Sequence, residues 1–315
     1  MQRITAIDIM QGTAMVLVVL GHHFFDFMPE WYGRMYYWIY TFHMPLFVFI
    51  SGFLVRYSYK GVNGVGEYRT YVGKRFRKFA LPYIIVGVLC ALLAWNFGDV
   101  GITDNMLNLL IAPKLGEARF LWYLYLLFMF YCMAPLIFNA KNMTRWCIAG
   151  MAFYFSVFYI PSNYLCADYF TKYFVFFMFG VLVAESYTRI RKIPKRWYML
   201  PAVVFVGMTV LHFQYGYNAI LEYAMQWMGI PACACAAWGL EKCRPVRDVL
   251  VRISQNCFAI YLYHMFIIQA GALLLTRLPW TIPSWGYFVY LLVSVAISIG
   301  LIVWGKEKCR LGFRV

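Results

Sequence analysis

Apolar residues in this sequence come in runs of roughly 18 to 22, separated by short polar segments. That is the length that an α-helix needs to cross about 30 Å of hydrocarbon. Because backbone N–H and C=O groups in lipid must pair within their own segment, each run is expected to be a helix. Ten spans are predicted, near residues 6–27, 36–55, 80–98, 120–139, 146–161, 169–187, 197–213, 218–239, 255–275 and 285–305. The pattern therefore predicts an all-α, polytopic membrane helix bundle of about ten transmembrane helices.

The composition agrees with a membrane protein. Hydrophobic residues make up 63% of the chain and charged residues only 13%, whereas a soluble domain carries about 25% charge. The short alternating segments of a membrane β-barrel are not seen. We expect residues 1–315 to form one integral membrane domain, without a soluble appended domain and without a cleavable signal peptide before the first run.

The formal net charge is +15, and its placement follows the predicted topology. If the first span enters from the cytoplasm, most lysines and arginines fall on the cytoplasmic side. The opposite side keeps Arg34, Lys114, Arg119, Lys172 and Arg277. This asymmetry obeys the positive-inside rule and predicts that both termini are cytoplasmic. The positive charge is therefore explained by topology, and we expect membrane lipid, not nucleic acid, as the surrounding partner.

Two predicted connections are longer than the others. Residues 56–79 read as a basic cytoplasmic loop, and residues 99–119 as an outer loop with room for a short helix. The first ends in the basic cluster Lys74-Arg75-Phe76-Arg77-Lys78. Such cations suit lipid headgroups or the phosphates of a nucleotide, and charge alone favours lipid.

The nine cysteines lie mainly within spans or at cytoplasmic ends. A disulfide framework is not expected for such a distribution. Cys233 and Cys235 lack the spacing of metal ligands, so no metal site is expected.

Polar residues gather in the first span, at Asp8, Gln11, His22, His23 and Asp26. Such groups are costly within a membrane, so each is a functional candidate. On a continuous helix, His22 lies about 25 Å from the cytoplasmic end. Asp26 then follows one turn later and could reach the ring of either His22 or His23. A carboxylate on one ring nitrogen leaves the other as a proton acceptor. Spacing alone favours the alternative that His22 bonds between helices while His23 and Asp26 are hydrated.

The second and ninth spans hold further polar or small residues. Ser51 and Gly52 follow His43 and Pro45, and their small size admits a close neighbour, either another helix or a substrate. Helix packing explains this pair as well as substrate binding does. Near the other end of the chain, Tyr261 and His264 lie within an apolar run.

In their order along the chain, these segments resemble the bacterial acyltransferase 3 family of integral membrane O-acyltransferases. The matching segments are Ile7-Asp8 to His22, Phe42-His43-Met44-Pro45-Leu46-Phe47, Ser51-Gly52-Phe53-Leu54, the basic cluster with Leu81-Pro82-Tyr83, Leu121-Trp122-Tyr123-Leu124, Phe179-Gly180, and Ile260-Tyr261-Leu262-Tyr263-His264. Each motif is weak alone, but the ordered set covers nearly the whole chain. One departure is clear, because the family has a basic residue where this sequence has Gln11.

The resemblance implies transfer of an acyl group, most often acetyl, from cytoplasmic acyl-CoA to a hydroxyl of a sugar or cell-surface glycan. The location implied is the bacterial cytoplasmic (inner) membrane. The co-substrate would be acyl-CoA, with no permanently bound cofactor, and the acceptor could be lipid-linked. Whether the chain forms a homo-oligomer is left open.

Roles for individual residues follow from the resemblance together with the residue chemistry. His22 is expected to act as general base, with Asp26 orienting it and Ser51 in the catalytic group. The substrate-binding candidates are Gln11, His43, Trp122, Tyr261 and His264. The acyl-CoA-binding candidates are Arg56, Arg75, Arg77 and Lys78. The oxyanion donor could be Ser51, Tyr261 or His264, and a covalent acyl-histidine intermediate is an alternative to general-base catalysis.

Two readings from other classes stay open. Basic cytoplasmic loops and histidines within spans also suit a transporter or flippase of a small anion or a lipid-linked sugar. Transporters often contain inverted repeats with broken helices, and the sequence has no evident internal symmetry. A membrane scaffold without catalytic activity would not need the polar residues of the first two spans.

Overall fold

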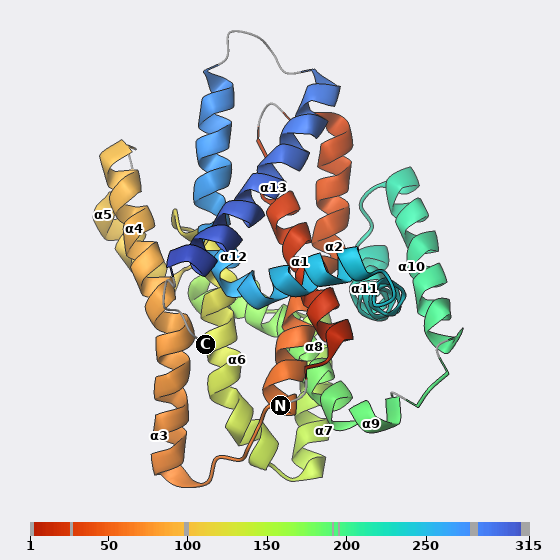
Figure 1. Ribbon diagram of the computed structural model, residues 1–315. Coiled ribbons are helices and arrows are strands. Elements are labelled where there is room, and N and C mark those ends of the chain that lie inside the picture. The colour runs from red at the N-terminus through yellow and green to blue at the C-terminus, as the bar shows by residue number, and fades with distance from the viewer. Residues whose placement is uncertain are drawn as a thin grey trace. The chain divides into compact units, whose positions relative to one another are not determined.

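The computed structural model describes residues 3–25, 28–97, 101–190, 192–194, 196–277 and 283–309. Within these ranges every regular element is a helix (Figure 1). In chain order they are α1 (Thr5–Gly21), α2 (Glu30–Tyr57), α3 (Gly64–Arg75), the π-helix η1 (Phe76–Ala80), α4 (Leu81–Phe97), α5 (Ile102–Ile111), η2 (Arg119–Leu121), α6 (Trp122–Asn139), α7 (Asn142–Val157), η3 (Tyr164–Cys166), α8 (Ala167–Glu185), α9 (Tyr187–Ile190), α10 (Arg196–Tyr215), α11 (Ala219–Leu240), α12 (Arg244–Thr276) and α13 (Ser284–Cys309). The all-α prediction is confirmed for this part of the chain.

Each of the ten predicted spans overlaps a helix. Six helical segments of the described chain are long and apolar enough to cross a membrane: Glu30–Tyr57, Gly64–Ala94, Arg119–Asn139, Tyr164–Glu185, Arg244–Thr276 and Ser284–Lys306. Two shorter helical segments, Thr5–Gly21 and Met199–Tyr215, are also apolar. The number of about ten crossings and the cytoplasmic location of both termini stay predictions.

The chain divides into two compact units. Unit 1 comprises Met1–Phe47 with Lys192–Arg314, and unit 2 comprises Val48–Arg191 together with the last residue. The boundary falls inside α2, so this helix contributes its first part to unit 1 and its last part to unit 2. The candidate residues of the two units are therefore described separately.

In unit 1, α1 packs against α12 and α11, α12 packs against α13, and α10 packs against α11. The approach of α1 to α12 is close at Gly12. A Cβ atom added to Gly12 would lie 2.2 Å from the carbonyl oxygen of Leu250. Only glycine therefore allows the two backbones to meet at this point.

In unit 2, the last part of α2 lies equally close to α8. A Cβ atom on Gly52 would lie 2.1 Å from the carbonyl oxygen of Phe177, and one on Gly180 would lie 2.1 Å from that of Phe49. The small residue at position 52 thus admits a neighbouring helix, as the helix-packing alternative for Ser51-Gly52 predicts.

α1 ends earlier than the predicted span of 6–27, and the side chains of two histidines bond the carbonyls of its last turn. His22 Nδ1 donates to the carbonyl oxygen of Val18 at 2.7 Å, and His23 Nδ1 donates to that of Val19 at 2.8 Å. These are the acceptors that the two backbone N–H groups would use in an α-helix. The backbone N–H groups turn instead to Val19 and Leu20, three residues back. The helix ends at Gly21, so the predicted span is too long at this end.

The predicted loop at 56–79 is also wrong over most of its length. α3, η1 and α4 follow one another without a break from Gly64 to Phe97. Pro82 explains the π-helical turn between them, since it has no N–H for the carbonyl of Lys78 and its ring would clash with that group in an α-helix. The expected short helix within 99–119 is α5, which spans Ile102–Ile111.

Candidate functional site

Four of the five histidines share one hydrogen-bonding pattern. In His22, His23, His43 and His264, Nδ1 bonds the backbone carbonyl oxygen four residues earlier, at 2.7 to 2.9 Å. A carbonyl oxygen can only accept, so each neutral ring carries its proton on Nδ1. The Nε2 atom of each ring is then a proton acceptor, which is the form that a general base requires.

His22 and His264 bring two of these rings together within unit 1. Their ring centroids are 4.8 Å apart, with an angle of 75° between the planes. His264 is fully buried, whereas His22 is partly exposed. His264 lies 6.1 Å from the ring of Tyr261, centroid to centroid. The structure thus brings three predicted site residues from α1 and α12 into one cluster, named here the histidine cluster.

His43 lies near the same end of α1, with the ring of Tyr40 between them. A Cβ atom on Gly21, the residue before His22, would lie 3.0 Å from the ring of Tyr40. The Tyr40 ring in turn lies 4.6 Å from the ring of His43, centroid to centroid. His43 is buried and donates through Nδ1 to Ile39 at 2.7 Å.

His23 serves a different purpose from His22. Its Nε2 atom accepts a hydrogen bond from Ser294 of α13 at 2.8 Å, and Tyr287 donates to its backbone carbonyl at 2.5 Å. His23 is fully buried. These contacts secure the chain just after α1 against α13, and so hold the neighbouring His22 in place.

Gln11 belongs to a polar contact between α1 and α12. Ser254 donates to Gln11 Oε1 at 2.9 Å, and its hydroxyl is 3.4 Å from a carboxylate oxygen of Asp8. The other oxygen of Asp8 pairs with Arg3 Nε at 3.2 Å. Gln11 lies eleven residues before His22, or about 16 Å along the helix, so it does not join the histidine cluster. Ser254 was not predicted, since a lone serine in a long helix carries no signal of its own.

Asp26 lies outside the described residues. It was expected to bond one ring nitrogen of His22 or His23, and Nδ1 of His22 already donates to Val18.

Ser51 lies in unit 2, where its hydroxyl bonds the phenol of Tyr123 at 2.8 Å. The Tyr131 hydroxyl also lies 3.5 Å from the backbone carbonyl of Ser51. These contacts join α2 to α6, so they give Ser51 a packing role within its unit.

Trp122 starts α6 in unit 2 and lies among aromatic and charged side chains. Its ring lies 4.4 Å from that of Tyr169 and 5.7 Å from that of Tyr173, centroid to centroid. The Lys114 ammonium lies 3.8 Å from the Tyr169 ring centroid and pairs with Asp168. Trp122 is thus part of an aromatic and ionic cluster on α8 and the connection before η2.

The basic cluster spans the end of α3 and the π-helical turn. The guanidinium of Arg75 lies over the rings of Tyr71 and Tyr131, 4.7 and 4.9 Å from their centroids. The ammonium of Lys78 lies 5.3 Å from the ring centroid of Phe79, and Arg77 is exposed. Arg75 is therefore held in a fixed direction by aromatic rings, while Arg77 presents its charge to the surroundings.

Arg56, the fourth predicted acyl-CoA ligand, has an ionic partner within the protein. Its Nε atom pairs with Glu185 at 2.7 Å, and its guanidinium lies 5.3 Å from the ring centroid of Phe138. Arg145 pairs with the same carboxylate oxygen of Glu185. These contacts connect α2, α7 and α8, so the structure groups Arg56 with this ion pair.

No group of three or more His, Cys, Asp or Glu side chains in the described part of the chain is placed to hold a metal ion. The histidine cluster itself offers imidazoles and the phenol of Tyr261, which are groups that transfer protons and form hydrogen bonds.

Six long apolar helical segments in the described chain place the protein in the class of multi-pass membrane proteins. The model of the family described as "Acyltransferase domain" (Acyl_transf_3) matches residues 4–303. The chain belongs to this acyltransferase family, as the ordered motifs predict. No curated protein and no solved structure matches the chain.

Proposed function

We propose that the protein is a membrane O-acyltransferase that moves an acyl group, acetyl in the first instance, from cytoplasmic acyl-CoA to a hydroxyl of a sugar or cell-surface glycan. The observation that carries this proposal is the state of His22. Its Nδ1 proton is committed to Val18 and its partly exposed ring carries a basic Nε2 atom. The membership of the acyltransferase family supplies the reaction class.

In the proposed reaction, Nε2 of His22 takes the proton of the acceptor hydroxyl as the oxygen attacks the thioester carbonyl. The carbon–sulfur bond then breaks, and the CoA thiolate leaves with the proton from the imidazolium. The Val18 carbonyl takes the orienting role that was expected of Asp26, because it already occupies Nδ1. A carbonyl beside the ring also stabilises the imidazolium that forms.

The developing oxyanion needs a hydrogen-bond donor. His264 does not suit this role in its neutral form, since its Nδ1 proton goes to the carbonyls of Ile260 and Tyr261. Its Nε2 atom is then an acceptor. Because its ring lies next to that of His22, His264 is suited to accept a hydrogen bond from protonated His22. The phenol of Tyr261 remains the candidate donor of this cluster.

The phosphates of CoA are assigned to Arg75, Arg77 and Lys78. The aromatic rings around Arg75 fix its direction, and a π-helical turn often occurs at functional sites. Arg56 is not included in this site, because it forms an ion pair with Glu185. With about ten crossings and cytoplasmic termini, the basic cluster would face the cytoplasmic acyl-CoA pool of a bacterial inner membrane.

The purified full-length protein in lipid nanodiscs tests this function. Incubation with acetyl-CoA and an extract of cell-surface glycans should release free CoA and yield acetylated glycan, detected by mass spectrometry. A burst of CoA release without acceptor would favour the acyl-histidine route. Glycan movement across the bilayer without any CoA release would favour the transporter reading and overturn the proposal.

A further inference from the structure

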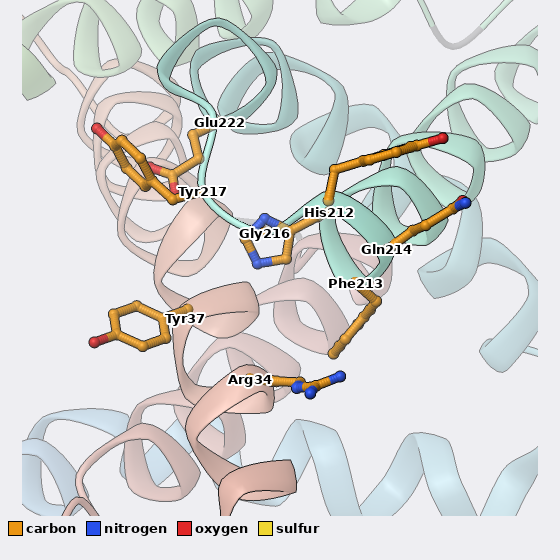
Figure 2. A pocket seen from close by; sticks show the side chains of 9 residues that line it. Arg34, Tyr37, His212, Phe213, Gln214, Gly216, Tyr217 and Glu222 are labelled. Atoms are coloured by element: carbon orange, nitrogen blue, oxygen red, sulfur yellow. The ribbon is translucent and has the colours of Figure 1, made fainter.

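A cavity of about 640 Å³ lies in unit 1, away from the histidine cluster. It is formed by the start of α2, the end of α10, the turn after α10 and the start of α11 (Figure 2). The side chains used below are Arg34, Tyr37, His212, Phe213, Tyr217 and Glu222. This volume falls in the range of small-molecule sites, and the lining includes the polar or charged side chains of Arg34, His212 and Glu222.

The turn that covers the cavity is built by two residues with distinct roles. Gly216 adopts a φ of +75°, and its N–H bonds the carbonyl of His212 at 2.9 Å, which ends α10 with a left-handed residue. Asn218 caps α11 by accepting from the N–H of Leu221 at 3.0 Å. The chain thus reverses within a few residues, and the reversal is fixed at both helix ends.

One buried polar atom of the lining has no hydrogen-bond partner among the described residues. His212 is 5% exposed, and its Nδ1 atom has no hydrogen bond. Figure 2 shows its ring in the middle of the lining side chains, beside the turn at Gly216. Buried polar groups are nearly always bonded, so this atom points to a polar ligand.

The charges around the cavity indicate the class of that ligand. Arg34 supplies a planar fork of donors, and Glu222 supplies acceptors. Arg34 also pairs with Glu30 at 2.6 Å, so one guanidinium stands against two carboxylates, those of Glu30 and Glu222. This excess of negative charge does not favour an anion such as a phosphate. The site suits a neutral ring that carries several hydroxyls, since each hydroxyl both donates and accepts.

Aromatic rings complete a site of this kind. Tyr37 and Tyr217 are both well exposed at the cavity, and their rigid, amphipathic rings offer a large contact area at low entropic cost. The negative face of an aromatic ring attracts the weakly positive C–H face of a sugar ring. Lipid chains would need none of the polar groups described above.

The position of the cavity relates it to the histidine cluster. Trp38, which follows Tyr37, donates to Thr209 of α10 at 3.1 Å and packs on Phe42. This contact fixes α2 against α10 beneath the cavity. Along α2, His43 lies six residues after Tyr37, or about 9 Å. α2 thus carries both a residue of the cavity, Tyr37, and a residue near the histidine cluster, His43.

We infer that the cavity between α2, α10 and α11 binds a sugar unit of the acceptor glycan and so selects the acceptor. This inference rests on the proposed function, because it assumes a glycan acceptor. It adds a binding site separate from the histidine cluster.

Direct binding tests the inference without relying on turnover. The probes are the methyl glycosides of common hexoses and of their disaccharides. Saturation-transfer NMR on the full-length protein in nanodiscs, without CoA, reports which of them bind. Wild type and His22→Ala should bind the same members of the panel. Glu222→Ala and Tyr37→Ala should weaken binding roughly tenfold or more. Tyr217→Ala, at an exposed side chain, is a second variant with little risk to folding.

Arg277→Ala is the matched control for Arg34→Ala, since both remove an exposed cation of unit 1 and only Arg34 lines the cavity. Arg34→Ala should weaken binding and Arg277→Ala should not. Binding that survives every cavity variant, or no binding by any probe to wild type, overturns the inference. If wild type binds sugars but does not transfer acyl groups, the proposed function is refuted and the binding site is not. If the cavity variants transfer acyl groups with an unchanged KM for the acceptor, the binding site is refuted and the proposed function is not.

Discussion

The imidazole of His22 meets that of His264 edge-on, with 4.8 Å between the ring centroids. Both rings donate through Nδ1 to carbonyls of their own helices. In the neutral state the Nε2 atom of each ring is therefore an acceptor. In the proposed reaction His22 takes a proton from a hydroxyl, and an acceptor beside its ring would stabilise the imidazolium.

Replacing His22 by alanine should remove the general base. We expect kcat for acyl transfer to fall by about 10² to 10⁴-fold, with little change in the KM for acetyl-CoA. His264→Gln should cause a smaller fall, since it removes only the acceptor beside the base. Release of free CoA and mass spectrometry of the acylated product measure both effects.

Arg277→Ala, at an exposed site outside the histidine cluster, controls for general effects of mutation. A His22→Ala protein that inserts normally and retains full transfer would refute the assignment of His22.

The two glycine positions in α1 and α10 predict opposite effects on stability. Gly12→Ala places a methyl group 2.2 Å from the carbonyl of Leu250, so α1 and α12 must move apart, at a cost of about 1–3 kcal/mol. Gly207→Ala meets nothing within 4 Å and should stabilise α10 by roughly 0.5–1 kcal/mol. Thermal unfolding in detergent, followed by circular dichroism, compares the two variants. Equal midpoints would show that α1 and α12 do not pack as closely as described.

Hydropathy predicts where the helices lie in this chain but not where each one ends. The run that begins near Ile7 stays apolar through Phe24 and Phe25, so hydropathy extends the first helix past His22. The helix ends at Gly21, where the imidazoles of His22 and His23 donate to the carbonyls of Val18 and Val19. Such contacts depend on side-chain rotamers, which the pattern of apolar residues does not contain.

The candidate site was likewise predicted only in part from the sequence. The ordered motifs identified His22, His43, Tyr261 and His264, and the structure places these in unit 1 around the end of α1. The partners Val18 and Ser294 were missed, since a backbone carbonyl and a lone serine leave no mark in a sequence. Gly216 and Asn218 do carry a sequence signal, because a glycine followed by an N-cap residue indicates a helix end and then a helix start.

The π-helical turn offers a test of the acyl-CoA site. Arg77→Gln removes an exposed charge from the basic cluster and should raise the KM for acetyl-CoA roughly tenfold, through loss of a charged hydrogen bond to phosphate. If Arg77 binds the 3′-phosphate, the KM for acetyl-dephospho-CoA, which lacks this phosphate, should differ less between Arg77→Gln and wild type. Initial rates over a range of donor concentrations provide the measurement.

Arg69→Gln removes the same charge from an exposed position on α3, before the basic cluster. It should leave the donor KM unchanged. An equal rise of KM in both variants would mean that the whole basic helix attracts CoA and that no particular residue binds it.

The departure at Gln11 gives the last prediction. Asp8 and Ser254 surround its side chain, and the Asp8 carboxylate is largely buried with Arg3 as its ionic partner. Gln11→Arg should be tolerated, since a guanidinium there can bond both the carboxylate and the serine hydroxyl. Gln11→Glu should destabilise the protein by about 1–3 kcal/mol, because it sets a second carboxylate beside Asp8 and removes the amide. Thermal unfolding of the two variants, which differ in the sign of the added charge, measures the effect. If Gln11→Glu instead proves the more stable of the two, Asp8 does not face residue 11, and the polar contact between α1 and α12 is misassigned.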